Sequence, residues 1–325
     1  MTNTEIIDRI RQLKKEKNAV ILAHYYTRPE VQDIADYLGD SLGLSQEAGK
    51  TDARIIVFCG VHFMAETAAI ISPDKKILIP ASGAGCSLAE SITGYELREW
   101  KKANPDGFIV SYVNTTAEVK AWTDICCTSA NALKVVQSIP PDHKILFVPD
   151  KNLGAWIRKV TGREMELWHG DCCVHERITT DMILEKSRDY PQADILIHPE
   201  SHCSHDEAIL NLPQAYMYST AMIRHASRSD KKQFIIATEI ETIHKLKNDN
   251  PDKEFIPVHP KTICGQMKKV TLESVLEALE KEQYVVEVAE DIRQRAWPLS
   301  RKCYKSNKTA VFPKQEYKLS ENQKL

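Results

Sequence analysis

The sequence predicts an α/β fold built from three related units of parallel sheet and helix. Short apolar runs of strand length alternate with helical segments, and the crossovers between strands are too short for anything but a helix. The order of these elements also recurs at a long period, which is typical of repeated units. Equivalent intervals of 45, 43 and 45 residues separate Ser41 from Cys86, Ser129 from Cys172 and Ser219 from Cys264, and the cysteines lie 86 and 92 residues apart.

The first unit begins with a capped amphipathic helix in residues 1–10. A continuous apolar run at 19–23 suits a strand buried on both faces. Pro29 favours the first turn of a helix, so residues 30–35 are expected to be helical. The remaining elements expected in this unit are an extended piece at 37–41, a helix through 46 and 48, a strand at 54–58, a helix at 63–71 and a strand at 76–80.

The same order of elements recurs twice. In the second pass the expected elements are a strand at 108–114, a helix at 116–122, an extended piece at 124–129, a helix at 131–136, a strand at 144–148, a helix at 153–160 and a strand at 165–168. In the third pass they are a strand at 193–200, a helix at 206–210, an extended piece at 215–220, a helix at 222–226, a strand at 233–239, a helix at 241–246 and a strand at 254–258. Charged helices at 271–279 and 287–295 are expected to pack back onto the first unit, before a solvated, Lys-rich tail from Ser306.

Composition argues against several classes of partner. The formal net charge is −2 and the isoelectric point is about 6.6, which does not favour nucleic acid or an anionic membrane. The N-terminus lacks the apolar core of a signal peptide, and no apolar run is long enough to span a bilayer. We therefore expect a soluble, cytoplasmic protein.

The nine cysteines need an explanation, because disulfides seldom persist in reducing cytosol. None are spaced Cys-x-x-Cys, so any metal site must be assembled from distant segments. The repeated trio Cys86, Cys172 and Cys264 suits a 4Fe-4S cluster that lacks a fourth protein ligand, or a zinc ion with an open position. An iron without a cysteine is a Lewis acid, which favours dehydration or condensation over electron transfer. The alternative is that these cysteines serve as small apolar residues.

Some cysteines occur as adjacent pairs, and successive residues of an extended segment point to opposite faces. At most one member of Cys126–Cys127 and one of Cys172–Cys173 should therefore face a common site, and the first pair is expected in the core. The remaining cysteines have no counterpart in the repeat and are expected to be structural or incidental: Cys59, Cys203 and Cys303.

Polar residues follow the predicted strands, where parallel α/β sheets bind ligands. His24, Tyr26, Tyr112, His198 and Glu200 are candidate acids and bases there, and His175 on the loop after Cys172 is a better candidate than His169. The hydroxyl residues Ser41, Ser129, Ser219 and Thr220 stand where extended pieces pass into helices, as expected of N-caps. Converging helix N-termini would also favour bound carboxylate or phosphate, whereas the absence of a Walker A or Gly-x-Gly-x-x-Gly pattern gives no indication of a nucleotide.

Short segments between about residue 18 and about residue 290 resemble the quinolinate synthase (quinolinate synthetase A) family of bacterial de novo NAD biosynthesis. They are Ala23-His-Tyr-Tyr26, residues 29–41, residues 60–67, Tyr112-Val-Asn114, residues 128–131, residues 149–153, His198-Pro-Glu200 and Cys264-Gly-Gln-Met267. They occur in the family's order.

The resemblance implies three similar three-layer α/β/α units with parallel sheets around a pseudo-threefold axis, and an active site at the centre. The implied units are 1–90 with 268–325, 91–177 and 178–267. It also implies one 4Fe-4S cluster held by three cysteines, and a transferase reaction that condenses iminoaspartate with dihydroxyacetone phosphate to quinolinate, phosphate and water. Coupling to an L-aspartate oxidase that supplies iminoaspartate follows from the same resemblance.

Carried over position by position, the family's sites fall on residues of this sequence. The implied cluster ligands are Cys86, Cys172 and Cys264. The implied catalytic residues are Tyr26, Tyr112, His175, His198 and Glu200. The implied substrate contacts are His24, Ser41, Tyr112, Asn114, Ser129, His198, Glu200, Ser219, Thr220 and Met267.

Two departures from the family pattern stand outside the cysteine trio. One small residue, rather than two, separates Thr220 from Met222, and Ser201 replaces a cysteine that usually follows His-Pro-Glu. Two other functions stay open at this point: another iron-sulfur hydro-lyase acting on a different carboxylic acid, and a noncatalytic redox or iron sensor. The sequence has no basic DNA-binding segment, which disfavours a DNA-binding form of the sensor.

Overall fold

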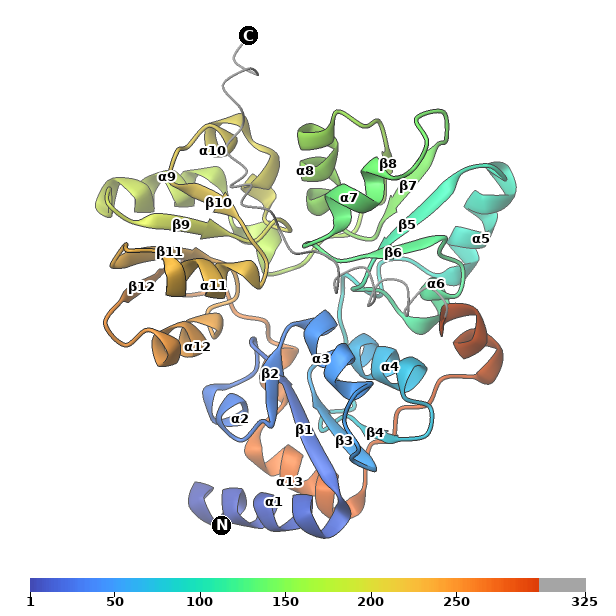
Figure 1. Ribbon diagram of the computed structural model, residues 1–325, viewed down its shortest axis with the longest axis vertical. Helices are drawn as coiled ribbons and strands as arrows, with labels where there is room; N and C mark the ends of the chain where they lie inside the picture. Colours follow the sequence, from blue (N-terminus) through green and yellow to red (C-terminus); the bar gives the residue numbers. More distant parts are fainter. Residues whose placement is uncertain (298–325) are drawn as a thin grey trace.

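The computed structural model describes residues 1–297 and contains three four-stranded sheets, all of whose strands are parallel. The first sheet has the order β2-β1-β3-β4, the second β6-β5-β7-β8 and the third β10-β9-β11-β12. Each sheet therefore repeats one topology, in which the first strand of the unit lies between the second and third. Helices flank every sheet, so the chain forms three α/β/α units arranged around a common centre, as the sequence predicted (Figure 1).

The first unit contains the N-terminal helix and the sheet that it covers. Its elements are α1 (Asn3–Lys17), β1 (Ala19–His24), α2 (Pro29–Asp33), β2 (Tyr37–Gly39), α3 (Ser41–Ala48), β3 (Ile55–Cys59), α4 (His62–Ile71) and β4 (Lys76–Leu78). Helix α1 starts at a capping box in which Thr2 accepts the Glu5 amide and the Glu5 side chain accepts the Thr2 amide. Its apolar face packs with α13 (Leu272–Lys281) over the outer strand surface.

The second and third units follow the same plan. The second comprises α5 (Gly94–Ala103), β5 (Phe108–Tyr112), α6 (Ala117–Lys120), β6 (Ile125–Cys127), α7 (Ala132–Gln137), β7 (Ile145–Val148), α8 (Lys151–Thr161), β8 (Glu166–Leu167) and the 3-10 helix η1 (His175–Arg177). The third comprises α9 (Thr180–Asp189), β9 (Asp194–Ile197), η2 (His202–His205), α10 (Glu207–Leu210), β10 (Ala215–Met217), α11 (Ala221–Arg228), β11 (Gln233–Ala237), α12 (Thr242–Asp249), β12 (Glu254–Pro257) and η3 (Met267–Lys269).

Helices α5 and α9 were missing from the sequence prediction. Both begin at a threonine N-cap, Thr93 for α5 and Thr179 for α9, and Thr271 caps α13 in the same way. Each threonine stands seven residues after a cysteine of the repeated trio. Helix α13 is thus the counterpart of α5 and α9, and the repeat includes a helix after every cysteine.

The serines that were predicted to cap helices do not do so. Helix α3 is capped by Asp40, whose carboxylate accepts the Gly43 amide at 2.7 Å, and Ser41 is the first residue of the helix. Helices α7 and α11 begin after Asn131 and Thr220, and neither residue makes a side-chain cap bond to its helix. In α3 the carboxylate of Asp40, one residue before Ser41, caps the helix instead.

The C-terminal part of the described chain packs in two places. Segment 284–286 lies along β4, where Val285 pairs with Leu78 and the Val286 amide donates to Ile77. The helical residues 290–297 then pack against Ile70 of α4 and Ala117 of α6, so this helix joins the first and second units rather than the first alone. The Lys-rich tail and Cys303 lie outside the described residues.

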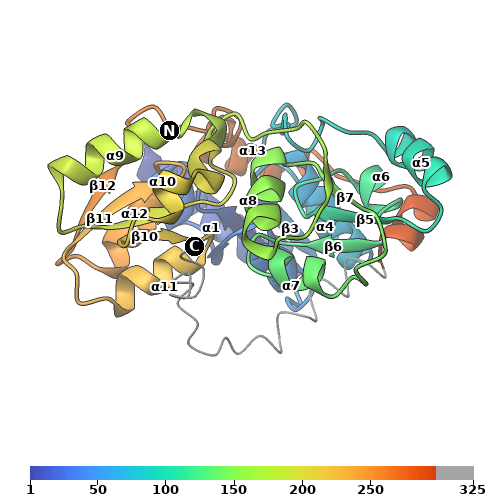
Figure 2. The ribbon, with the colours of Figure 1, turned by 90° about the horizontal axis from the view of Figure 1, so that it is seen from above.

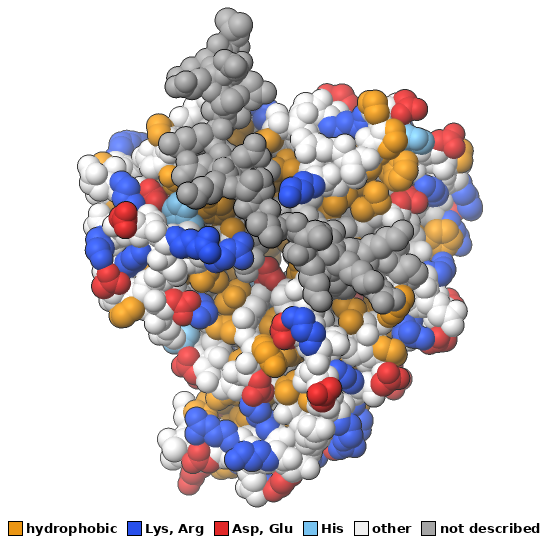
Figure 3. Space-filling view, in the orientation of Figure 1, with side chains coloured by type: hydrophobic (Ala, Val, Ile, Leu, Met, Phe, Trp, Pro, Cys, Tyr) orange, Lys and Arg blue, Asp and Glu red, His pale blue; other side chains and the backbone are white. Residues whose placement is uncertain are grey.

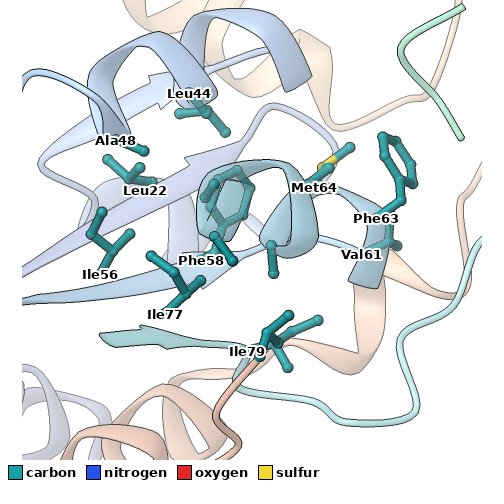
Figure 4. Close-up of a cluster of buried hydrophobic side chains, with 14 of the residues drawn as sticks. Leu22, Leu44, Ala48, Ile56, Phe58, Val61, Phe63, Met64, Ile77 and Ile79 are labelled. Atoms are coloured by element: carbon teal, nitrogen blue, oxygen red, sulfur yellow. The ribbon is translucent and has the colours of Figure 1, made fainter. Parts of the chain in front are cut away.

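The cores lie between the sheets and their helices and reach the centre of the molecule. Figure 4 shows the first of them, where Phe58 of β3, Leu22 of β1 and Met64 of α4 pack together. Met267 belongs to the same cluster and Cys86 and Cys264 pack against it, so the core supports the loops that carry them. Figure 1 shows the three units side by side around the centre, and Figure 2 shows from above that the molecule is flat in that direction.

The outer surface carries both signs of charge. Acidic and basic side chains are interspersed on the face shown in Figure 3. None of the helices in the described part of the chain has the length and apolar character that crossing a membrane requires.

Candidate active site

A cavity lies at the centre, and residues of all three units line it. The lining includes every residue that the sequence singled out for catalysis, substrate or metal: His24, Tyr26, Ser41, Cys86, Tyr112, Asn114, Ser129, Cys172, His175, His198, Glu200, Ser219, Thr220, Cys264 and Met267. His169, the alternative to His175, is exposed and is not among the residues that line the cavity.

Equivalent strand ends bring these side chains together. His24 is the last residue of β1, Tyr112 is the last of β5, and His198 directly follows β9. These three strands hold the same position in their sheets. Because ligands of parallel sheets bind beyond the carboxyl ends of the strands, the repeat directs one set of polar groups from each unit to one place.

The three repeated cysteines occupy the same turn. In each, the amide four residues later donates to the cysteine carbonyl: Glu90 to Cys86 at 2.9 Å, Glu176 to Cys172 at 2.9 Å and Lys268 to Cys264 at 3.2 Å. The amides two and three residues after each cysteine also hydrogen-bond to its sulfur, namely Leu88 and Ala89, Val174 and His175, and Gln266 and Met267. Three copies of one sulfur-binding turn therefore face the cavity.

Burial raises the pKa of all three thiols, that of Cys86 to about 12, although the turn amides lower it. The cysteines also raise one another's pKa, Cys264 that of Cys86 and Cys86 that of Cys172, so the sulfurs are close enough to interact. A bound metal would have to displace the thiol protons, and the amides favour the thiolate that remains.

One prediction about the paired cysteines was wrong. Both Cys172 and Cys173 line the cavity, because residues 173–174 form a turn and alternation between two faces applies only to extended chain. Cys126 and Cys127 do lie in the core of the second unit, on β6, and Cys59 and Cys203 lie in other cores.

Glu200 is the centre of a buried hydrogen-bond network. The Tyr112 hydroxyl donates to Glu200 Oε1 at 2.6 Å, and His175 Nδ1 lies 3.1 Å from Glu200 Oε2. Burial alone would raise the pKa of Glu200, but His198, His175 and Tyr112 lower it to about 2. Burial and the Glu200 charge hold the pKa of Tyr112 well above its usual value. At neutral pH the pair is a carboxylate and a phenol that keeps its proton.

Two histidines at the cavity are neutral. Burial, together with neighbouring histidines, lowers the pKa of His24 and of His198 to about 3. The Tyr26 amide donates to His24 Nδ1 at 3.1 Å, and the Glu200 amide donates to His198 Nδ1 at 3.3 Å. Since Nδ1 is the acceptor in both rings, Nε2 carries the ring proton and is the available donor.

Thr238 is a cavity residue that the sequence analysis missed. Its hydroxyl lies 2.9 Å from the Tyr26 hydroxyl and 2.9 Å from His175 Nε2, so it connects two candidate acid/base groups. Thr238 directly follows β11, and the rule that selected His24 and His198 would also have selected it. The prediction extended that strand to residue 239 and did not single out Thr238.

Hydroxyl and amide groups line another part of the cavity. Ser41, Ser129 and Ser219 contribute there, and Asn114 Oδ1 is buried without a hydrogen-bond partner among the described residues. Thr220 donates to Asp40 Oδ2 at 2.7 Å, which joins α11 to the start of α3. No lysine or arginine of the described chain lines the cavity, so an anionic ligand would meet neutral donors.

The spacing of the sulfurs limits the metal that they can share. Two ligands of one zinc ion, at about 2.3 Å each, lie no more than about 4.6 Å apart. Within the described chain, the one group of potential ligands that lie mutually within 4.8 Å is Cys172, His175 and Glu200. The sulfurs of Cys86, Cys172 and Cys264 do not form such a group as their side chains stand, and a multi-iron cluster presents separate metal atoms to separate thiolates.

Comparison with known proteins gives one consistent result. The family model described as Quinolinate synthetase A protein matches residues 8–303. The chain is 49% identical to the quinolinate synthase of Pyrobaculum aerophilum over 294 residues, which cover 89% of this chain and 95% of that protein. It is 48% identical to that of Thermus thermophilus over 297 residues (91% and 96%) and 49% identical to that of Synechocystis over 282 residues (85% and 87%). The chain thus belongs to the quinolinate synthetase A family.

Proposed function

We propose that this protein is a quinolinate synthase of NAD biosynthesis, a transferase that condenses iminoaspartate with dihydroxyacetone phosphate to quinolinate, phosphate and water. The observation that carries the proposal is the threefold repeat of one cysteine turn around a cavity that Glu200, three tyrosines and three histidines also line. The same proposal includes a cytoplasmic location and supply of iminoaspartate by an L-aspartate oxidase.

We propose that Cys86, Cys172 and Cys264 hold one 4Fe-4S cluster. The donor set fits this group, because two backbone amides lower the pKa of each thiol and so favour the thiolate that binds iron. When bound, the cluster supplies an iron without a cysteine, which acts as a Lewis acid toward a carboxylate or hydroxyl of the substrate.

The chain's own groups account for the proton transfers. Glu200 is ionised at neutral pH and can accept a proton, while Tyr112 and Tyr26 keep theirs and can donate. His24 and His198 are neutral and offer Nε2–H as a donor. Formation of the ring needs loss of phosphate and water but no external oxidant, so acids and bases within hydrogen-bond reach of one another are the groups that the reaction requires.

We assign the substrate contacts to His24, Ser41, Tyr112, Asn114, Ser129, His198, Glu200, Ser219, Thr220 and Met267, all of which line the cavity. Asn114 Oδ1 supports this assignment, because it is buried and has no hydrogen-bond partner among the described residues. A buried acceptor without a donor destabilises the protein, and a ligand that donates a hydrogen bond to it would remove that cost. The proposed units remain 1–90 with 268–325, 91–177 and 178–267, of which 298–325 lie outside the described residues.

The test is an assay of anaerobically purified, iron-replete protein with iminoaspartate generated in place and dihydroxyacetone phosphate. We expect quinolinate and phosphate to form together. Iron-replete protein that makes no quinolinate would overturn the proposal and return attention to a hydro-lyase with another substrate. An iron and sulfide count of the same preparation shows whether the cluster was present.

A further inference from the structure

A buried ion pair lies behind Cys264, outside the network of Glu200. Glu239, two residues after β11, has a fully buried side chain, and Lys268 in η3 has a side chain that is only 14% exposed. Lys268 Nζ lies 2.6 Å from Glu239 Oε1. Neither residue lines the cavity. Because a charge is costly to bury without a partner, a pair of this kind beside a functional loop calls for a role.

Glu239 connects the Cys264 turn, through Oε1, to the segment after β11, through Oε2. Its Oε1 accepts the Cys264 amide at 3.1 Å in addition to Lys268, and its Oε2 accepts the Glu241 amide at 2.9 Å. The carboxylate therefore fixes the backbone at Cys264 relative to the end of β11. It also places a negative charge next to the thiol, and this charge contributes to raising the pKa of Cys264 after burial.

Lys268 connects the same turn to the first unit. Its Nζ donates to the Tyr26 carbonyl at 2.5 Å, and its own carbonyl accepts Arg28 Nε at 2.9 Å. Its amide closes the turn on the Cys264 carbonyl. One lysine thus ties the loop of a candidate cluster ligand to the strand end that carries the candidate acid/base Tyr26.

The Cys86 turn offers a natural comparison. The Cys86 amide donates to Glu90 Oε1 at 3.0 Å, as the Cys264 amide does to Glu239. Glu90 is exposed, however, and water screens an exposed charge. A charge at Glu239 acts in a medium of lower dielectric constant and is felt more strongly nearby. This explains why the buried carboxylate is matched by a lysine.

We propose that Glu239 and Lys268 are a positioning pair, which locks the Cys264 turn against the Tyr26 strand end and whose opposite charges cancel, so that the pair itself adds no net charge beside a cluster bound at Cys264. The inference rests on the proposed function. It goes beyond the set of ligands and substrate contacts, because both residues act through Cys264 and Tyr26.

The test is a charge cycle on the iron-replete protein. The variants are Glu239→Gln, the double variant Glu239→Gln/Lys268→Met, and the matched control Glu90→Gln. The midpoint potential of the cluster is measured by redox titration followed by electron paramagnetic resonance, with an iron count for each variant. Glu239→Gln removes the nearer of the two carboxylates beside Lys268, at 2.6 Å, and leaves Glu241 Oε1 at 3.9 Å, so the charge beside the turn becomes one unit more positive. This should favour the reduced cluster by about tenfold at a fixed solution potential, which is about 59 mV for one electron.

The double variant should return the potential to near the wild-type value, and Glu90→Gln should leave it unchanged. If the pair only held the turn in place, the midpoint potential of the double variant, which loses more contacts, would differ from the wild-type value by more than that of Glu239→Gln. If Glu239→Gln does not retain iron, the double variant must retain it for the inference to stand. An unshifted potential in Glu239→Gln, or iron lost from both variants, overturns the inference. Wild-type protein that holds no iron would overturn the proposed function instead, so the two failures are distinct.

Discussion

The Tyr112 hydroxyl donates a hydrogen bond of 2.6 Å to Glu200 Oε1, which joins the end of β5 in the second sheet to the loop after β9 in the third. The two residues are 88 positions apart in the sequence and both are buried. The bond keeps an ionised carboxylate in contact with a phenol that retains its proton. A proton-transfer site requires this arrangement of a base and an acid.

Tyr112→Phe tests this relationship. The variant keeps the ring but leaves Glu200 Oε1 without its donor, so we expect kcat for quinolinate formation to fall by about 10²–10⁴-fold. Iron content should stay at the wild-type level, because Tyr112 is not a proposed ligand. The measurement is steady-state kinetics with an iron count on the same sample, and an unchanged kcat would contradict a role for the pair in catalysis.

Adjacent cysteines provide a matched pair of variants for the metal site. Cys172→Ser should lose bound iron, as should Cys86→Ser and Cys264→Ser, because each removes a sulfur that two turn amides orient. Cys173→Ser should keep its iron, although that thiol also lines the cavity, and so should the core variant Cys127→Ser. The measurement is the iron and sulfide content of each variant after anaerobic purification. Iron retained in all three variants of the trio would rule out the ligand assignment.

The sequence allowed much of the fold, and many of the residues that line the central cavity, to be predicted, because both depend on local signals that repeat. Strand-like apolar runs placed His24 and His198 at strand ends, and the family resemblance aligned Cys172 rather than its neighbour Cys173 with the repeated cysteines. The missed helix α5 starts with Gly94 and is rich in charged residues, so its threonine cap was the available signal. Such a cap is weak evidence when it is read alone.

Contacts between units could not be predicted, since no local pattern encodes them. Tyr26 meets Thr238 across 212 positions, and Lys268 meets Tyr26 across 242. Glu239 was predicted as the last residue of a strand, and only the fold shows that it is buried against Lys268. The same limit explains the serines, because the capping role of Asp40 depends on how the chain enters α3.

The buried histidines predict how stability depends on pH. The pKa of His24 and of His198 is about 3 in the folded protein and 6.5 in the unfolded chain, so below pH 6.5 the unfolded state binds protons that the folded state does not. Stability should therefore be full above pH 6.5 and fall as the pH drops toward 3, with a slope of up to about 1.4 kcal/mol per pH unit for each histidine.

Urea unfolding of iron-free protein between pH 7 and 5 measures this slope without a contribution from cluster loss. His24→Gln should flatten it, because one of the two titrating groups is gone. Glu200, with a lowered pKa of about 2, contributes separately, and its contribution is lost only between about pH 4.5 and 2. A slope that His24→Gln leaves unaltered would show that the folded protein accepts a proton at that ring.

The helix caps of the repeat predict a stability effect away from the site. Thr93→Ala removes a capping box in which Thr93 accepts the Glu96 amide, so the free energy of unfolding should fall by about 0.5–2 kcal/mol. Thr93→Ser keeps the hydroxyl and should lose much less. Chemical denaturation of both variants is the measurement, and equal losses would mean that the methyl group, rather than the cap, supports α5.

The bond from Thr220 to Asp40 predicts an effect on substrate binding. It joins the start of α11 in the third unit to the cap of α3 in the first, and both residues line the cavity. Thr220→Val keeps the shape of the side chain but removes the donor, so the two helix starts lose their connection and the Asp40 charge loses a partner. We expect KM for dihydroxyacetone phosphate to rise by about tenfold, because a lost hydrogen bond to a charged group costs about 1.5–3 kcal/mol and only part of that falls on binding. Thr220→Ser should restore the wild-type KM, since it returns the hydroxyl. A KM that Thr220→Val leaves unchanged would show that the shortened segment before Met222 has moved this contact out of the substrate site.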